Sequence, residues 1–123
     1  MTRINVVPPS ELCRQHLVAE YRELPRIFTL ARNALDRGEK PDDKRNPVSY
    51  TLGTGHCRFF YSRLGWLHDR HQQLVNEMLN RGYQPTIFLD PVDMPSNWMK
   101  PWKPSAADLD INRQRILARM PKS

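Results

Sequence analysis

Apolar residues recur at helical spacing in three stretches of this chain, which restricts it to a fold built mainly from helices. The first stretch runs from about Ser10 to Arg37, and its apolar residues recur at i, i+4, i+7, i+11, i+14 and i+18, as on one face of a helix. They are Leu17, Tyr21, Leu24, Phe28, Ala31 and Leu35. Pro25 lies inside this pattern, so the helix should kink or break between Tyr21 and Leu24.

The second stretch runs from about Gly55 to Arg81 and the third from about Ser105 to Met120. The second repeats the spacing of the first with Phe60, Leu64, Leu67, His71, Leu74 and Met78. The third has a thinner apolar face, made of Leu109, Ile111, Ile116 and Leu117. Expected end signals are an N-cap at Ser10 with Glu11 in the first turn, stops at Gly38 and Gly82, and a Ser105/Asp108 capping box.

A segment dense in proline separates the second and third stretches. Its prolines are Pro85, Pro91, Pro95, Pro101 and Pro104. We expect an ordered irregular connection there, pinned by Phe88, Trp98 and Trp102, because proline disfavours both helix interior and central strand. The chain has 123 residues and no repeat or linker. The sequence therefore predicts an all-α fold, a single compact domain over residues 1–123 with three main helices.

Charge and composition narrow the class of protein. Lys and Arg number 19 against 13 Asp and Glu, a formal net charge of +6, which favours a polyanionic partner without naming one. No apolar run approaches the roughly 18 to 20 residues that a bilayer span needs, and the N-terminus lacks the apolar segment of a secretory signal. Cys13 and Cys57 form no CxxC pair. We expect a cytoplasmic, monomeric protein with no membrane contact.

Charged residues gather opposite the apolar stripe of the first stretch. Arg22 and Arg26 are four apart and project from one face, with Glu23 among them and Gln15 and His16 about two turns earlier. One interpretation is a solvated face with weak exposed ion pairs. The other is a phosphate-binding face around one carboxylate, because the planar guanidinium pairs bidentately with phosphate. Spacing alone leaves both open.

The N-terminus can reach this face. Thr2 to Ser10 is eight residues, which span at most about 26 Å when extended. Glu23 lies thirteen residues beyond Ser10, about 20 Å along a helix. The N-terminal segment can therefore fold back along the helix and set its amine, with Arg3, beside Glu23.

At these residues the chain resembles the pyrimidine-dimer DNA glycosylase / AP lyase family, the phage ultraviolet-repair enzymes of the endonuclease V type. The resemblance opens with MTRIN, SEL, QHL and AEYRELPR. It continues with LGTGH, FFY and RG, and closes with the basic segment INRQRILAR. It extends nearly from end to end without large insertions.

The resemblance implies a role for each matching residue. The nucleophile is the α-amine of Thr2, exposed when Met1 is removed, and the essential carboxylate is Glu23. The residues implied to bind DNA are Arg3, Gln15, His16, Arg22, Arg26, Arg115 and Arg119. The implied partner is double-stranded DNA with pyrimidine dimers or abasic sites. The implied location in the cell is the bacterial nucleoid or, if the protein is phage-encoded, the host cell. No metal and no cofactor are implied.

The implied chemistry suits these groups. An α-amine has an ordinary pKa of about 7.7 to 8.0 against about 10.4 for lysine, so a useful fraction is unprotonated near neutral pH. It would attack C1′, displace the base and form an imine (a Schiff base), after which β-elimination nicks the strand. Glu23 would stabilise the cationic sugar and move protons. The family is also expected to kink DNA and flip a base out of the stack.

Two alternatives stay open. One is the same glycosylase and lyase chemistry on another damaged or modified base. The other is a catalytically silent DNA-binding helical module, which the basic faces would suit equally well.

Several residues have ordinary structural explanations. His71 lies on an apolar stripe and is expected in the core rather than in a metal site with His68. Gly53 and Gly55 are expected to shape the turn before a helix, and both cysteines to pack as small apolar residues. Four arginines of the second stretch are expected to be solvated, some extending the DNA face: Arg58, Arg63, Arg70 and Arg81.

Overall fold

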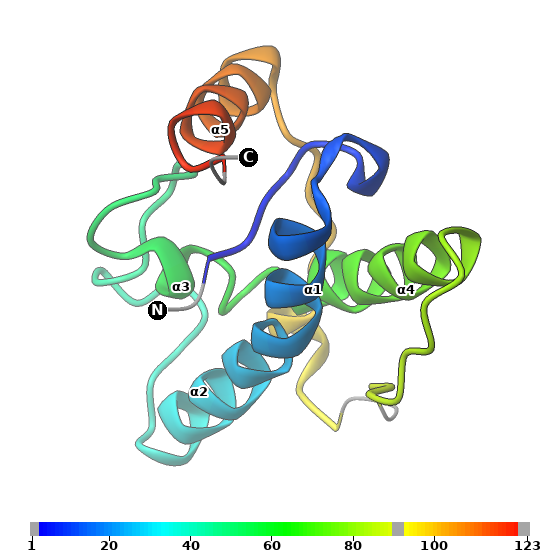
Figure 1. Ribbon diagram of the computed structural model, residues 1–123. Coiled ribbons are helices and arrows are strands. Elements are labelled where there is room, and N and C mark those ends of the chain that lie inside the picture. Colours follow the sequence, from blue (N-terminus) through cyan, green and yellow to red (C-terminus); the bar gives the residue numbers. More distant parts are fainter. Residues whose placement is uncertain (1–2, 90–92, 121–123) are drawn as a thin grey trace.

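The computed structural model describes residues 3–89 and 93–120, and these residues form five α-helices (Figure 1). The helices are α1 (Arg14–Glu23), α2 (Pro25–Asp36), α3 (His56–Phe59), α4 (Leu64–Asn80) and α5 (Ala106–Ala118). Two 3-10 turns lie at Pro9–Glu11 and Ser96–Trp98. Within the described ranges no strand forms beyond an isolated antiparallel bridge between Arg63 and Met99. The all-α prediction is confirmed.

The first predicted helix is divided at Pro25, as expected. α1 and α2 follow one another along nearly one line in Figure 1. Leu24 keeps helical angles (φ −54°, ψ −43°) and its N–H donates to the Glu20 carbonyl at 2.9 Å, but Pro25 has no N–H to donate. Gly38 follows α2 with a φ of +87°, which confirms the predicted stop.

The start of that helix differs from the prediction. Ser10 belongs to the 3-10 turn Pro9–Glu11 and does not cap α1. Leu12 is extended (φ −85°, ψ 139°) and ends this turn, so α1 begins only at Arg14 with Cys13 as its N-cap. Leu12 is buried, and an extended backbone at that position lets the chain turn its side chain into the core before the helix starts.

The second predicted helix is two helices. Residues 59–62 (FFYS) are all buried, and one helix cannot turn four successive residues toward one core. The chain instead turns between α3 and α4 through i→i−3 hydrogen bonds such as that from Arg63 N–H to the Phe60 carbonyl at 2.9 Å. The far end of α4 is as predicted, because Gly82 follows it with a φ of +85°.

The third predicted helix is α5, and it begins with the predicted capping box. The Asp108 N–H donates to Ser105 Oγ at 3.1 Å, and the Ser105 N–H donates to an Asp108 carboxylate oxygen at 2.9 Å. Its predicted apolar face is wrong at two positions: Ile111 is 43% exposed and Leu117 is 74% exposed. The buried residues of α5 are Asn112 and Ile116, because the helix contacts polar backbone of the N-terminal segment as well as the apolar core.

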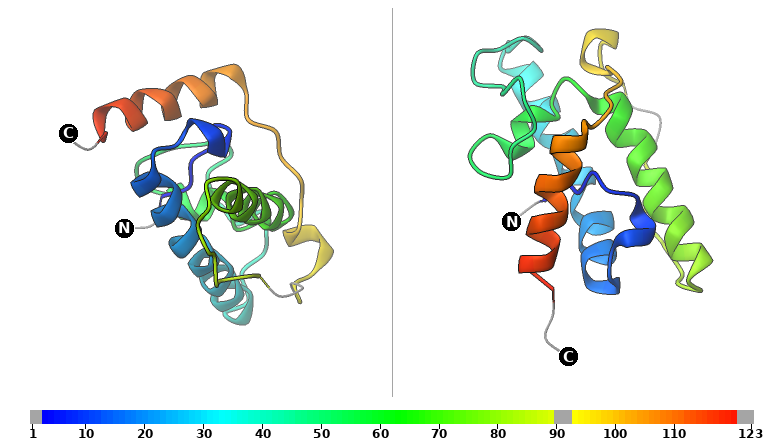
Figure 2. Two further views of the ribbon diagram at one scale, coloured as in Figure 1. Left: turned by 45° about the vertical axis from the view of Figure 1, so that its right-hand side comes forward. Right: turned by 90° about the horizontal axis from the view of Figure 1, so that it is seen from above.

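The core lies between α1, α2, α4 and the N-terminal segment, which runs between α1 and α5 in both figures (Figures 1 and 2). Trp98 is buried in the core, and Trp102 packs against Phe59 with ring centroids 5.0 Å apart. These two tryptophans therefore pin the proline-rich connection as expected, whereas Phe88 does not, since it is 62% exposed. Among the described residues, no helix combines the length and the apolar character that crossing a bilayer would need.

Candidate active site and DNA-binding face

Side chains from four parts of the chain hold the backbone of the N-terminal segment. The Ile4 N–H donates to His56 Nε2 at 2.7 Å, and the Tyr50 hydroxyl donates to the Ile4 carbonyl at 3.1 Å. Asn112 Oδ1 accepts from the N–H groups of residues 6 and 7 at 2.7 and 3.1 Å. An Arg70 guanidinium nitrogen donates to the carbonyl of residue 7 at 2.6 Å. We call His56, Tyr50, Asn112 and Arg70 the N-terminal clamp.

A buried polar network supports the clamp from behind. Arg70 makes a bidentate pair with Glu20, with contacts of 2.7 and 3.1 Å. Asn5 Nδ2 donates to the same carboxylate at 3.0 Å, and Asn112 Nδ2 donates to Asn5 Oδ1 at 2.8 Å. All four side chains are buried, so each lost partner would leave a polar group without water to replace it.

The clamp holds the N-terminal segment alongside α1, which the length of the segment allows. Glu20 of α1 contacts Asn5, so the segment does fold back along the helix. Thr2, the predicted nucleophile, lies outside the described residues. Arg3, the first described residue, borders a cavity of about 560 Å³ whose other lining residues are residues 53–58.

Residues 53–58 form the turn into α3. Gly55 is the N-cap of α3 and has a φ of +88°, a left-handed backbone that favours glycine. A Cβ there would also collide with the ring of Pro47. The expectation that this glycine shapes the start of a helix is confirmed, and the same turn forms one wall of the cavity.

The predicted carboxylate and two predicted arginines act on one residue of this cavity. Burial raises the pKa of the half-buried Cys57 thiol; the charges of Arg3 and Arg26 act against that rise, and the charge of Glu23 adds to it. Electrostatic influence fades with distance and with screening by water. The charges of Arg3, Glu23 and Arg26, which come from the N-terminal segment, α1 and α2, therefore all reach Cys57 in the wall of the cavity.

The two remaining predicted arginines are Arg115 of α5 and Arg119, the residue that caps its C-terminal end. Burial lowers the pKa of the Arg115 guanidinium, and repulsion from Arg3 and Arg119 lowers it further. His16 Nε2 lies 3.1 Å from the Arg119 carbonyl and so links α1 to the end of α5. These basic groups thus repel one another, and a bound polyanion would relieve that repulsion.

Gln15 and Arg22 are exposed on α1, and no described contact joins them to the cavity. Their prediction as DNA-binding residues therefore rests on sequence alone. Arg26 is likewise exposed, although its charge reaches Cys57.

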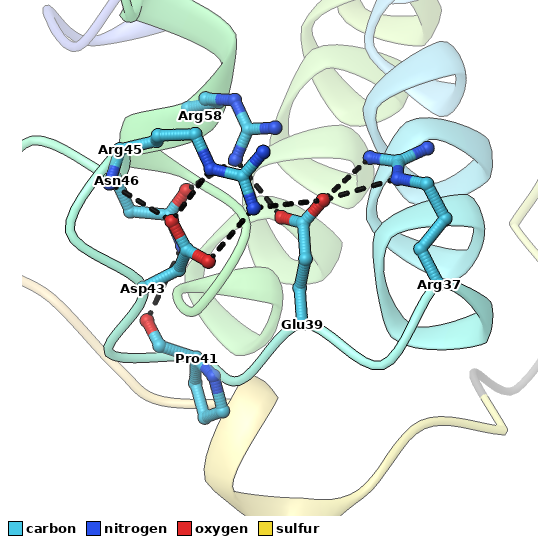
Figure 3. Close-up of polar contacts among 7 residues, drawn as sticks. All are labelled: Arg37, Glu39, Pro41, Asp43, Arg45, Asn46 and Arg58. Carbon is cyan, nitrogen blue, oxygen red and sulfur yellow. Dashed lines mark hydrogen bonds and ion pairs between the residues drawn. The ribbon is translucent and has the colours of Figure 1, made fainter.

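Arg58 lines the cavity and belongs also to a surface cluster (Figure 3). It donates to Glu39 at 3.0 Å and to Asn46 at 3.0 Å, and its guanidinium lies 5.2 Å from the centre of the Tyr61 ring. Glu39 also pairs with two arginines that reach solvent, at 2.8 and 3.4 Å. We call Arg37, Glu39, Asp43, Arg45, Asn46 and Arg58 the Glu39 cluster.

The expectation that the arginines of the second stretch are solvated is wrong for Arg70, which is 2% exposed. Arg58, Arg63 and Arg81 are partly buried. Arg63 lies over the Phe59 ring, and Arg81 donates to the Leu12 carbonyl at 2.7 Å. Among the other expectations, His71 is buried and its Nε2 lies 3.1 Å from the Tyr21 carbonyl, so it is a core histidine.

The buried roles of Glu20, Arg70 and Asn112 were not predicted, although the sequence carries a common signal for them. Each has an apolar residue three positions before it and another four positions after it. The flanking pairs are Leu17 and Leu24, Leu67 and Leu74, and Leu109 and Ile116. A polar residue so flanked faces the core with its neighbours and needs a buried partner.

Comparison with known families supplies the remaining observation. A family model described as pyrimidine dimer DNA glycosylase matches residues 1–90. The matched region contains α1 to α4, the segment held by the clamp and the walls of the cavity, whereas α5 with Arg115 and Arg119 lies beyond it. Because the match covers well over half of the 123 residues, the chain belongs to the pyrimidine dimer DNA glycosylase family.

Proposed function

We propose that this protein is a bifunctional DNA N-glycosylase and AP lyase acting on cyclobutane pyrimidine dimers. The observation that supports it best is the position of Arg3, which borders a cavity whose Cys57 also experiences the charges of Glu23 and Arg26. Thr2 precedes Arg3 in the chain, so its α-amine would be within reach of that cavity once Met1 is removed.

The reaction begins with the free α-amine of Thr2 as nucleophile. It attacks C1′ of the damaged nucleotide, and the glycosidic bond breaks with its electron pair leaving on the base nitrogen. The amine then loses its protons as the sugar ring opens at the C1′–O4′ bond, which gives an imine between Thr2 and C1′. Removal of a C2′ proton expels the 3′ phosphate by β-elimination and nicks the strand.

Glu23 has two roles in this scheme. Its negative charge stabilises the positive charge that develops on the sugar as the base departs. It also accepts and returns protons at C2′ and O4′, as a general base and acid. These steps need only groups of the protein and of the DNA.

Five arginines, a histidine and a glutamine hold the duplex through its phosphates. The set comprises Arg3, Gln15, His16, Arg22, Arg26, Arg115 and Arg119. Such contacts carry little sequence information, so binding should weaken steeply with salt. Reaching C1′ requires distortion of the duplex and flipping of the adenine opposite the dimer, and a lesion that already weakens stacking lowers that cost.

Borohydride trapping tests the proposal. Incubation with abasic-site duplex and borohydride should reduce the imine to a stable protein–DNA adduct, and mass spectrometry should find the DNA on the N-terminal peptide. Acetylating the N-terminus should abolish trapping while duplex binding persists. Binding without an adduct would indicate the silent module instead, and an adduct without cleavage of dimer-bearing duplex would indicate a different lesion.

The role of Glu23 needs a separate variant. Glu23→Gln should bind dimer-bearing duplex as the wild type does and lose most strand cleavage, because it removes the charge and the base but keeps the shape. Asp36→Asn, which neutralises an exposed carboxylate at the far end of α2, is the matched control and should cleave normally. Near-normal turnover of Glu23→Gln would remove Glu23 from the mechanism.

A further inference from the structure

Of the backbone groups that the N-terminal clamp holds, the one bound by His56 lies nearest in the chain to the proposed nucleophile. Its Nε2 contacts the N–H of Ile4 at 2.7 Å, and Ile4 is two residues from Thr2. Two residues span at most about 7 Å. The position of the Ile4 amide therefore limits where the α-amine can lie.

The two hydrogen bonds of His56 fix its tautomer. Nδ1 lies 2.6 Å from the Thr51 carbonyl, which can only accept, so Nδ1 carries the proton. The Ile4 N–H can only donate, so Nε2 is unprotonated and accepts. His56 is thus a neutral imidazole that joins the turn before α3 to the N-terminal segment.

The surroundings of His56 keep it neutral and fixed. The side chain is 2% exposed and lies edge-on to Tyr50 and Phe60, with ring centroids 5.8 and 5.6 Å away. The charges that face it are those of Arg3 and Arg115, and both oppose protonation. Burial is the main cause of a pKa lowered to about 4, partly offset by the bond to the Thr51 carbonyl.

We propose that His56 is a positioning residue for the N-terminal nucleophile, because its unprotonated Nε2 holds the Ile4 amide and so fixes where the preceding residues meet the cavity. This inference rests on the proposed function of Thr2. His56 touches neither the sugar nor the leaving base, and it acts only through the backbone. Its loss should therefore slow imine formation while DNA binding stays unchanged.

Two substitutions separate the two hydrogen bonds of the ring. His56→Asn places an amide nitrogen near the position of Nδ1 and can keep the bond to Thr51, but it cannot reach Ile4. His56→Gln extends an amide oxygen toward the position of Nε2 and can accept from the Ile4 N–H. A misplaced reacting group can cost up to about a hundredfold in rate. We expect the single-turnover trapping rate to fall about 10- to 100-fold in His56→Asn and to be largely retained in His56→Gln.

A second buried histidine provides the matched control. His71 has the same exposure as His56, 2%, and also contacts a backbone carbonyl, but that carbonyl belongs to Tyr21 of α1 and not to the N-terminal segment. His71→Asn should therefore lose comparable thermal stability and keep its trapping rate per folded molecule. Duplex affinity should be equal in all four proteins, measured below their unfolding temperatures.

The outcomes are distinct. Trapping by His56→Asn at the wild-type rate would overturn the inference and leave the proposed function intact, whereas a wild type that does not trap at all would overturn the proposed function, and the inference with it. A measurement on the wild type covers the case in which variants fail to fold: nitrogen NMR of His56 should show a protonated Nδ1 and a bare Nε2 at neutral pH. A protonated Nε2 would also overturn the inference.

Discussion

The N-terminal clamp and the Glu39 cluster both tie a non-helical segment to the helices through side-chain hydrogen bonds, but they differ in access to water. In the clamp, every partner is less than a tenth exposed. In the Glu39 cluster, the Glu39 side chain is 6% exposed, whereas the side chains of Arg37 and Arg45 are 55% and 62% exposed. Water can replace a lost partner in the cluster and cannot do so in the clamp.

The buried contacts of the clamp therefore fix the position of the N-terminal segment, whereas the exposed contacts of the Glu39 cluster do not fix the segment that they join. Arginine bonding lowers the pKa of the Glu39 and Asp43 carboxyls, as expected for paired acids. Yet exposed pairs are screened by salt and contribute little to stability. Arg58 lies between the two regions, since it pairs with Glu39 and also lines the cavity beside Arg3.

The largest effect is expected from breaking the buried pair behind the clamp. Arg70→Met leaves the Glu20 carboxylate buried without its cation and removes the donor to the carbonyl of Val7. Loss of one partner of a buried pair typically costs about 3–5 kcal/mol, so the free energy of unfolding should fall by that amount in urea denaturation. Arg22→Met, at an exposed position of α1, is the control and should change it by less than about 0.5 kcal/mol. Equal losses in the two variants would mean that burial does not distinguish these arginines.

How far the sequence predicts the fold is clear from its helices. The division at Pro25 and the stops at Gly38 and Gly82 were predictable because each depends on one residue's backbone chemistry. The late start of α1 and the break before α4 were not, because both arise where the core draws in neighbouring side chains, such as Leu12 and residues 59–62. Local preference does not contain that tertiary requirement.

The candidate site divides in the same way. That Arg3 can approach Glu23 and Arg26 was predictable, because the length of the N-terminal segment and the helical repeat permit it. The side chains that hold the segment were not predictable, because Tyr50, His56 and Asn112 contact it across sequence separations of 46, 52 and 106 residues. No spacing rule covers such distances, although the apolar flanks of Asn112 did indicate that it faces inward.

The second largest effect is expected from protonating His56. Its folded-state pKa of about 4 lies below the ordinary 6.5, so the unfolded chain binds the proton first as the pH falls. The clamp's contribution is therefore complete above about pH 6.5, decreases between about pH 6.5 and 4, and levels off below about 4, a total of about 3 kcal/mol. Urea denaturation over this range should show that decrease in the wild type and lack most of it in His56→Gln. Parallel pH profiles would show that His56 is not held neutral.

A smaller effect is expected from a single neutral hydrogen bond of the clamp. Tyr50→Phe keeps the ring contacts and removes only the donor to the Ile4 carbonyl, so it should lower the free energy of unfolding by about 1 kcal/mol. Tyr61→Phe is the matched control, since both tyrosines are 6% exposed and Tyr61 is not a member of the clamp. A larger loss in Tyr61→Phe than in Tyr50→Phe would contradict the assignment of this hydroxyl to the clamp.

The smallest effect is expected in the Glu39 cluster, where Arg45→Gln removes the ion pair with Asp43 at 2.9 Å and the longer contact with Glu39 at 3.4 Å. Arg37 and Arg58 still hold Glu39, and water replaces Arg45 at the solvent side, so thermal unfolding should move less than in Tyr50→Phe. Any remaining difference from the wild type should vanish in about 1 M sodium chloride, where the Debye length is about 3 Å. Arg70→Met should keep its loss under the same conditions, because no counterion reaches a side chain that is 2% exposed. If Arg45→Gln instead matched Tyr50→Phe in both size and salt resistance, exposure would not be what separates the two regions, and the Glu39 cluster would have to be counted with the clamp among the contacts that position the cavity.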